Sequence, residues 1–592
     1  MVSVKRHTHK KKAGSQLAII EQCENRLLFA FGFVGHSDGS FTIDTGGNTV
    51  FVVDKGGNMT SLLHNGKQIQ TAGKTGHFES GLPGTVKTTI TENSAKGTIL
   101  VTAASSSNGL IQYYIAKKGD GNVYLDTYAS SWPGEMRYYF SFDTNLLTSG
   151  NNANNPSNYA SGNKNLESPD TVVNTKTGWT FSKFYGNSRM IDPGSYRFGL
   201  TGNGIGAFFD ISSHEKQSGG PFFSDIQGIT YYMWSDHAQI EPFPGTFRAG
   251  LQGGYSIALT NGGQPGHIDY SFYDGLGLKG YVPASGRGSI TGASTTNARG
   301  VNTVVALANN NGQYWATARG GQYTITGVLP GTYTETLYQG ELAVGSQTVT
   351  IGAGKTTNAN IADTRTQPTA IWTIGTWDGT PLEFENGPKF RTMHPSDSRM
   401  TPWKPVDFFV GTSATDTFPA AQWKDIGNIP TIHFNLTAAQ AAESLTLRIG
   451  STDTFAAGRD FIVVNNGKYT SPLPASGPEP DARTLVHGTY RGYNHTWTYT
   501  IPAGVLVSGA NTISLHVNAG TGSTQWLSPS IAYDAIDLVT TASLNGGSIG
   551  AAAVARFAAV APATTPASVF SSTAIVDNTI KQLLVSPDLV IT

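Results

Sequence analysis

The chain has 592 residues and a formal net charge of -1, and only 13% of its residues are Asp, Glu, Lys or Arg. This length accommodates three or four domains with substantial buried cores. The near-zero charge excludes a global electrostatic field that would recruit nucleic acid or an anionic membrane, so a polyanionic ligand would have to be held by local cations.

The first 34 residues differ in composition from the rest of the chain. A basic opening, MVSVKRHTHKKK, precedes a short apolar run at residues 27–34, which is the order of an export signal. We therefore expect residues 1–34 to be a leader and the protein to be secreted or held at the cell surface. The alternative is a disordered basic tail before an edge strand. Cys23 is the only cysteine, so no disulfide can form within the chain, and no apolar run approaches the length of a membrane span.

Residues 35–278 carry one short strand pattern after another. Period-two alternation or short apolar runs occur at 41–44, 49–53, 98–102 and 111–115, and turn residues such as Gly-Gly and Asn-Gly separate them. No stretch of this segment keeps a helical period over several turns. These features predict a large antiparallel β-sandwich as the first domain.

Two further β-rich segments and a low-complexity tail follow. Residues 279–367 alternate in the same way around a Pro330-Gly331 turn, which predicts a small β-sandwich that acts as a spacer. Residues 368–540 repeat short strands with turn residues between them, which predicts a third β domain. Residues 541–592 include a region at 551–571 that is rich in Ala, Thr, Pro and Val, which is typical of a linker, and a short apolar segment follows it.

Several motifs in a fixed order carry a resemblance to a known family. SKFYGNSRMID, SGGPFFSDI and YYMWSDH are similar to the catalytic domain of the rhamnogalacturonan lyases, polysaccharide lyase family 4. GYVPASGRGSITG, NNNGQYWAT, IGTWDGTP, RTMHPSDSRM and YDAIDL extend the resemblance, which covers about residues 35–540. It implies an all-β chain made of a large galactose-mutarotase-like β-sandwich, a fibronectin-III-like sandwich and a jelly roll similar to carbohydrate-binding modules.

The resemblance also implies a reaction, the cleavage of the rhamnose–galacturonic acid backbone of rhamnogalacturonan I by β-elimination. This reaction removes the proton on C5, next to the galacturonate carboxylate. The site therefore needs a base over C5, a cation near the carboxylate and a proton donor for the leaving oxygen. Calcium can serve as the cation, but residues 130–240 contain no Asp-x-Asp cluster. We therefore expect Lys and Arg to supply the charge, with no metal and no cofactor required for catalysis, and we leave structural calcium open.

Four residues match the family's site by their motifs. Lys183 and His237 match its catalytic lysine and histidine, Arg137 a substrate-binding arginine, and Tyr232 a site tyrosine. A guanidinium can hold the galacturonate carboxylate by two parallel hydrogen bonds. A neutral lysine suits removal of the C5 proton, and a histidine near neutral pH can donate one. The sequence leaves open which of the two is the base.

Other positions depart from the family pattern or supply aromatic rings. Ser141 stands where the pattern suggests a second arginine, Thr230 where it suggests a tyrosine, and Trp234 where it has a polar residue. Trp132, Tyr185 and Trp234 are candidate stacking platforms, because the apolar faces of sugar rings pack on aromatic rings. We expect these rings and the four motif residues to line one groove of the first domain.

Two other functions stay open on the residues alone. The same scaffold could serve a non-catalytic carbohydrate-binding or surface protein, because a fold does not establish an activity. A glycoside hydrolase needs paired carboxylates, and Asp225 and Asp236 are candidates by elimination only. On composition alone, three other histidines could be argued for in place of His237, namely His214, His267 and His394. The partner we expect is rhamnogalacturonan I, bound by a monomer without nucleic acid and without a membrane span.

Overall fold

The computed structural model describes residues 30–134, 136–150, 163–166, 168–182, 185, 189–217, 219–223, 230–234, 247–297, 300–365, 368–477, 485–488, 490–491, 494–518 and 524–545. Most of the predicted leader and nearly all of the predicted tail lie outside these residues. Within the described part of the chain, no helix is long and apolar enough to cross a membrane.

The predicted all-β fold class is confirmed. Among the described residues the only α-helices are the four-residue α2 (Ala438–Ala441) and the five-residue α3 (Thr541–Asn545). Helix α2 begins at a capping box in which Thr437 and Gln440 bond each other's backbone N–H groups. The longer elements of the described residues are strands, as the short alternating runs indicated.

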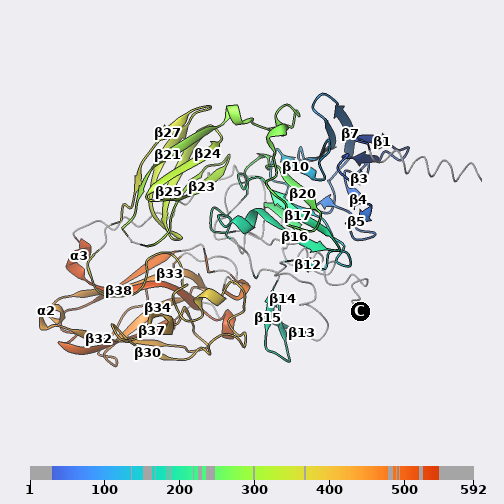
Figure 1. Ribbon diagram of the computed structural model, residues 1–592. Helices are drawn as coiled ribbons and strands as arrows, with labels where there is room; N and C mark the ends of the chain where they lie inside the picture. Colours follow the sequence, from blue (N-terminus) through green and yellow to red (C-terminus); the bar gives the residue numbers. More distant parts are fainter. Residues whose placement is uncertain are drawn as a thin grey trace, which may run out of the picture. The chain divides into compact units, whose positions relative to one another are not determined.

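The first domain contains a five-stranded and a nine-stranded sheet (Figure 1). The five-stranded sheet has the order β1 (Gly32–Gly35), β2 (Phe41–Asp44), β3 (Thr49–Val53), β4 (Met59–His64) and β5 (Lys67–Gln68). The nine-stranded sheet has the order β12 (Ser149–Gly150), β16 (Arg197–Gly202), β17 (Ile205–Ile211), β20 (Tyr255–Thr260), β10 (Val123–Ala129), β9 (Ile111–Lys117), β8 (Thr98–Ser105) and β7 (Val86–Asn93), with β19 (Gly250–Leu251) paired to β10.

These two sheets share one core. Phe51 and Leu62 of the smaller sheet pack with Val101, Tyr114 and Ile257 of the larger one in a single cluster of fully buried side chains. The opposite face of the larger sheet is also covered, by the loop segment that contains Tyr273 and Leu278. Because both faces of the sheet are covered, nearly all residues of β9 and β10 are buried, without the alternation of a strand that has one face in solvent.

Two three-stranded sheets complete the first domain, and one of them carries Arg137 and Tyr232. One has the order β18 (Thr230–Trp234), β11 (Met136–Tyr139) and β6 (His77–Phe78). The other has the order β13 (Asn163–Leu166), β14 (Ser168–Asn174) and β15 (Thr180–Ser182).

The second domain is a small sandwich of two four-stranded sheets. One contains β24 (Gln322–Val328), β21 (Gly288–Thr295), β27 (Thr356–Asn358) and β28 (Ile361–Ala362), and the other β23 (Gln313–Ala318), β22 (Thr303–Ala308), β25 (Gly331–Gln339) and β26 (Leu342–Ile351). Ile290 and Ile325 of the first sheet pack against Val305 and Leu337 of the second. The Pro330-Gly331 turn leads into β25, where Gly331 adopts a φ of 156°.

The third domain is a sandwich of two five-stranded sheets. One contains β29 (Ala370–Gly375), β38 (Ser530–Thr540), β33 (Leu445–Phe455), β36 (His495–Ile501) and β31 (Ala421–Trp423). The other contains β30 (Val406–Phe409), β32 (Pro430–Leu436), β37 (Gly509–Asn518), β34 (Arg459–Val464) and β35 (Tyr469–Thr470). Leu447 and Ile536 of the first sheet meet Phe408, Ile432 and Leu515 of the second in its core.

Candidate active site

The sheet β18-β11-β6 separates a core face from a polar face. Met136 and Tyr138 on β11, together with Phe78 on β6, are at most 3% exposed and belong to the core of the first domain. Side chains alternate along a strand, so Arg137 and Tyr139 lie on the opposite face. The register places Tyr139 across from His77 and Arg137 across from Tyr232.

Arg137 is held in place by its neighbours on this face. Its side chain is 9% exposed, and its Nε lies 3.2 Å from Oε1 of Glu79. The backbone N–H of Glu79 donates to the Arg137 carbonyl at 3.0 Å, and the guanidinium carbon lies 4.7 Å from the centroid of the Tyr139 ring. A carboxylate on one side and a π-face on the other favour a charged and oriented guanidinium. Glu135, the partner that a simple surface ion pair would use, lies outside the described residues.

His77 and Glu79 belong to this cluster, although the sequence motifs did not single them out. The rings of His77 and Tyr139 are 5.3 Å apart between centroids. Burial lowers the pKa of His77, and the charge of Arg137 lowers it further, so the imidazole is neutral near pH 7. The segment KTGHFESG carries no spacing that signals a site, and only the pairing of β6 with β11 places it beside Arg137.

The candidate stacking residues differ in exposure. Trp132 is 57% exposed in the segment between β10 and β11, so its ring is open to a ligand. Tyr185 is only 4% exposed, and its hydroxyl donates to the carbonyl of Val486 at 3.1 Å. The ring of Tyr185 therefore packs against the third domain and does not face solvent.

Comparison with known proteins gives the family. Sequence models match the N-terminal domain of rhamnogalacturonan lyase B at residues 31–280, domain II of polysaccharide lyase family 4 at residues 287–359 and domain III of that family at residues 370–538. The chain is 37% identical over 524 residues to rhamnogalacturonate lyase A of Emericella nidulans, which covers 86% of this chain and 96% of that protein. It is 36% identical over 524 residues to rhamnogalacturonate lyase A of Aspergillus aculeatus, with the same coverage. The chain belongs to polysaccharide lyase family 4. The resemblance predicted from its motifs is confirmed.

Only some of the residues that match the family's site lie in the described part of the structure. Lys183 and His237 lie outside the described residues, as do Asp225 and Asp236. The backbones of Tyr232 and Trp234 lie on β18, paired with Arg137 and Met136, with a bulge between these two pairs. The structure thus brings Tyr232 next to Arg137 in register, and the convergence of all four motif residues on one groove stays a prediction.

Three positions where the chain departs from the family pattern lie at this sheet, and one of them is Trp234 on β18. The Ser141 hydroxyl donates to Oγ1 of Thr71 at 3.1 Å, and the Ser141 carbonyl accepts from the Thr71 N–H. Thr230 pairs with Tyr139, the last residue of β11, at the same end of that strand as Ser141. Ser141 therefore hydrogen-bonds the end of β11 to the segment after β5. The arginine of the family pattern would have placed a second cation at this position.

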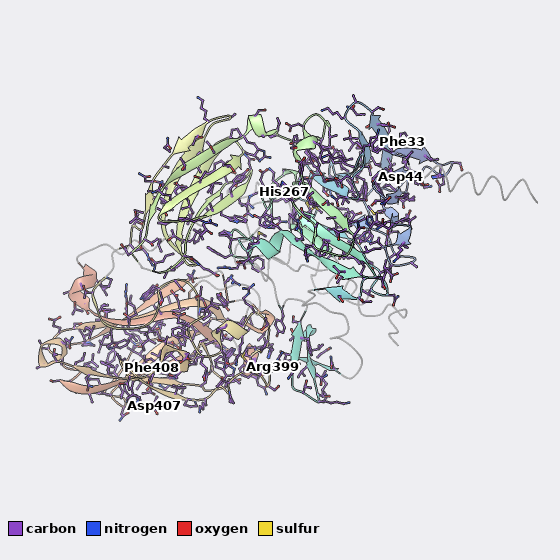
Figure 2. The ribbon with its side chains drawn as sticks, viewed as in Figure 1. Phe33, Asp44, His267, Arg399, Asp407 and Phe408 are labelled. Atoms are coloured by element: carbon purple, nitrogen blue, oxygen red, sulfur yellow. The ribbon has the colours of Figure 1, made fainter. Side chains whose placement is uncertain are left out.

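The other histidines occupy different environments from the Arg137 cluster. His214 is 3% exposed and bonds the side chains of Ser195 and Gln217, and burial lowers its pKa to about 4. His394 is fully buried in the third domain, whereas His267, which is labelled in Figure 2, belongs to the exposed residues. None of the three lies on the sheet that carries Arg137.

Lys216 is a buried lysine that the sequence motifs do not include. Burial lowers its pKa, which is a property of catalytic lysines, but its Nζ donates to the carbonyl of Asn311 in the second domain at 2.5 Å. Nearby, the carboxylate of Glu215 binds Arg287 and accepts from the Tyr314 hydroxyl. These groups join the first domain to the second.

The described part of the chain shows no cluster of potential metal ligands. No group of three or more His, Cys, Asp or Glu side chains there is arranged to hold a metal ion. The cations that the described site does offer to an acidic sugar come from arginine.

Proposed function

We propose that this protein is a rhamnogalacturonan lyase that cleaves the rhamnose–galacturonic acid backbone of rhamnogalacturonan I by β-elimination. The observation that carries this proposal is the 37% identity to a rhamnogalacturonate lyase over 96% of that relative's length. The buried arginine on the polar face of β18-β11-β6 supports it, because an acidic sugar needs a local cation on a chain with almost no net charge.

The elimination requires a base, a proton donor and a cation at the site. A base takes the proton from C5, the electron pair of that C–H bond forms the C4–C5 double bond, and the bond from C4 to the glycosidic oxygen breaks. The leaving oxygen takes up a proton and becomes the hydroxyl of the released chain, while the other product ends in an unsaturated uronate. Charge builds up on the C5 carboxylate during this step, so a cation placed there lowers the barrier.

Arg137 binds the galacturonate carboxylate in this proposal. Its planar fork of N–H donors matches a carboxylate, and Glu79 and Tyr139 keep the fork in one orientation. Trp132, exposed beside β11, stacks on a neighbouring sugar ring, and Tyr232 and Trp234 belong to the same binding region by their positions on β18.

Lys183 acts as the base at C5 and His237 protonates the leaving oxygen. A cation such as Arg137 near an amine and exclusion of water both lower the pKa of a lysine, which favours the neutral form that accepts a proton. The reverse assignment gives the same products. The pKa of each group in the pH profile of kcat/KM, followed in variants of either residue, distinguishes the two.

The remaining properties follow from the substrate. A plant cell-wall polymer is met outside the producing cell, and the basic and apolar leader supports secretion. We expect a monomer that needs no cofactor for catalysis.

The test is incubation of the purified protein with rhamnogalacturonan I while the absorbance of the unsaturated uronate is followed. Lys183→Ala should lower kcat by about 10³-fold or more, since loss of a base removes an interaction of the transition state. Lys164→Ala, which removes an exposed lysine on β13, is the control and should keep wild-type turnover. New reducing ends without absorbance would indicate a hydrolase, binding without either would indicate a carbohydrate-binding protein, and normal turnover of Lys183→Ala would refute the role of Lys183.

A further inference from the structure

Strand β15 leads directly into Lys183 and lies against the third domain. It spans Thr180–Ser182, so its last residue precedes Lys183 in the chain. Within its own sheet it is an edge strand that pairs with β14 alone. The segment 394–399, which belongs to the RTMHPSDSRM motif of the third domain, contacts the chain at and before β15.

Asp397 makes the central contact. Its Oδ2 accepts hydrogen bonds from the Thr180 backbone N–H at 2.6 Å and from the Thr180 hydroxyl at 2.7 Å. The same hydroxyl accepts from the backbone N–H of His394 at 2.9 Å. Thr180 and Asp397 are 1% and 3% exposed, so these bonds are made out of contact with water and are costly to lose.

Arg399 holds the Asp397 carboxylate in its charged form. Its Nε and Nη2 donate to the two carboxylate oxygens at 2.8 and 2.7 Å. Burial raises the pKa of Asp397, but hydrogen bonds from Arg399 and Thr180 outweigh it and lower that pKa. The Arg399 guanidinium also lies 4.7 Å from the centroid of the Trp179 ring, so it contacts the residue that precedes β15.

The chain on either side of Lys183 is anchored to the third domain. Before it, Ser398 bonds the carbonyls of Thr177 and Gly178 in addition to the Thr180–Asp397 contact. After it, the buried Tyr185 donates to Val486. Gly488, at a φ of +83°, lies so close that a Cβ there would come within 2.7 Å of the Tyr185 ring. Thr180 and Tyr185, three residues before and two residues after Lys183, are thus both fixed by the third domain.

We infer that Asp397 and Arg399 of the third domain are positioning residues for the elimination, because they fix strand β15, which ends at the residue before Lys183 in the sequence. This inference rests on the proposed function, in which Lys183 removes the C5 proton. A base has to lie within hydrogen-bond reach of its proton, and a shift of about 1 Å can lower a rate about 100-fold. The third domain then has a part in catalysis that does not require it to bind carbohydrate.

The chain contains a matched control for this contact. Asp363 and Arg365 in the second domain form the same Asp-x-Arg arrangement, with Nε to Oδ1 at 3.1 Å and Nη2 to Oδ2 at 2.8 Å. The Asp363 side chain is 1% exposed. Among the described residues its carboxylate bonds Arg365 and makes no bond to the first domain.

The experiment compares Asp397→Asn and Asp363→Asn on rhamnogalacturonan I. Asp397→Asn puts an amide N–H₂ where the carboxylate accepts from Thr180 or Arg399, so kcat should fall about 10- to 100-fold with KM within about twofold. Asp363→Asn should keep kcat within about twofold of the wild type. Equal turnover in the two variants, or a loss in Asp397→Asn that lies mainly in KM, overturns the inference.

A second pair of variants keeps the test decisive if Asp397→Asn does not fold. Thr180→Ser keeps the hydroxyl and should retain wild-type kcat, whereas Thr180→Val keeps the shape and loses both hydroxyl bonds, so its kcat should fall about tenfold. Similar kcat in these two variants contradicts the inference. A wild type that forms no double bond contradicts the proposed function, whereas an active wild type with an unaffected Asp397→Asn contradicts only the positioning role.

Discussion

Glu341 joins the three domains through its carboxylate, and its removal should destabilise the whole protein. It lies between β25 and β26 of the second domain, with its side chain 4% exposed. Arg491 of the third domain binds it at 2.8 and 3.2 Å, and Arg189 of the first domain lies 3.5 Å away. Asn494 of the third domain donates to its backbone carbonyl. Glu341→Gln removes the negative charge that faces the buried guanidinium of Arg491.

The size of this effect follows from the exposure of the partners. Breaking a fully buried ion pair costs about 3–5 kcal/mol, because the remaining charge is desolvated without compensation. The side chain of Arg491 is 6% exposed, so that range applies, whereas Arg189 is 33% exposed and adds less than about 1 kcal/mol. Glutamine keeps one acceptor oxygen, so we expect about 3 kcal/mol in total. For domains of this size that corresponds to a fall in Tm of roughly 6–12 °C.

The assay is scanning calorimetry at fixed scan rate, with two further variants. Glu341→Gln combined with Arg491→Met removes both charges and should recover at least half of the lost Tm, since neutral replacement of a buried pair costs little. Asp269→Asn breaks a surface ion pair in which Lys117 is 33% and Asp269 53% exposed, and it should change Tm by less than about 2 °C. A double variant no more stable than Glu341→Gln alone would show that the arginine charge is not the cause.

Two further predictions concern pH and substrate binding. Burial raises the pKa of Asp460 to about 7, above the value of 3.8 expected in the unfolded chain. Between about pH 4 and pH 7 the folded protein therefore keeps a proton that the unfolded chain releases, and the free energy of unfolding falls as pH rises through this range. Asp460→Asn cannot ionise and should therefore lose less Tm than the wild type from pH 4 to pH 8, and parallel Tm curves would contradict this. Arg137→Ala should raise KM for rhamnogalacturonan I by at least about tenfold with a smaller loss of kcat. Arg137→Lys keeps the positive charge but loses the two parallel N–H donors, so its KM should lie between those of the wild type and Arg137→Ala. An unchanged KM in Arg137→Ala would remove Arg137 from the substrate site.

The sequence by itself determined the fold class and the family. Strand periodicity and turn residues act over a few neighbours, so runs at 41–44 and 49–53 coincide with β2 and β3. The motifs identified the lyase family because several occur in a fixed order, and they singled out Arg137, which the structure places on a polar sheet face.

Only the tertiary structure decided which distant residues meet. His77 and Glu79 reach Arg137 through strand pairing across about sixty residues, and no local pattern encodes that register. Asp397 meets Thr180 across 217 residues, so a motif recognised in the sequence obtained a role only when two domains were seen in contact. Tyr185 has the composition of a stacking residue, but its burial against Val486 directs it to a domain contact. Local sequence sets the conformation of each segment, whereas packing between segments sets the surroundings of each side chain, and chemistry depends on those surroundings.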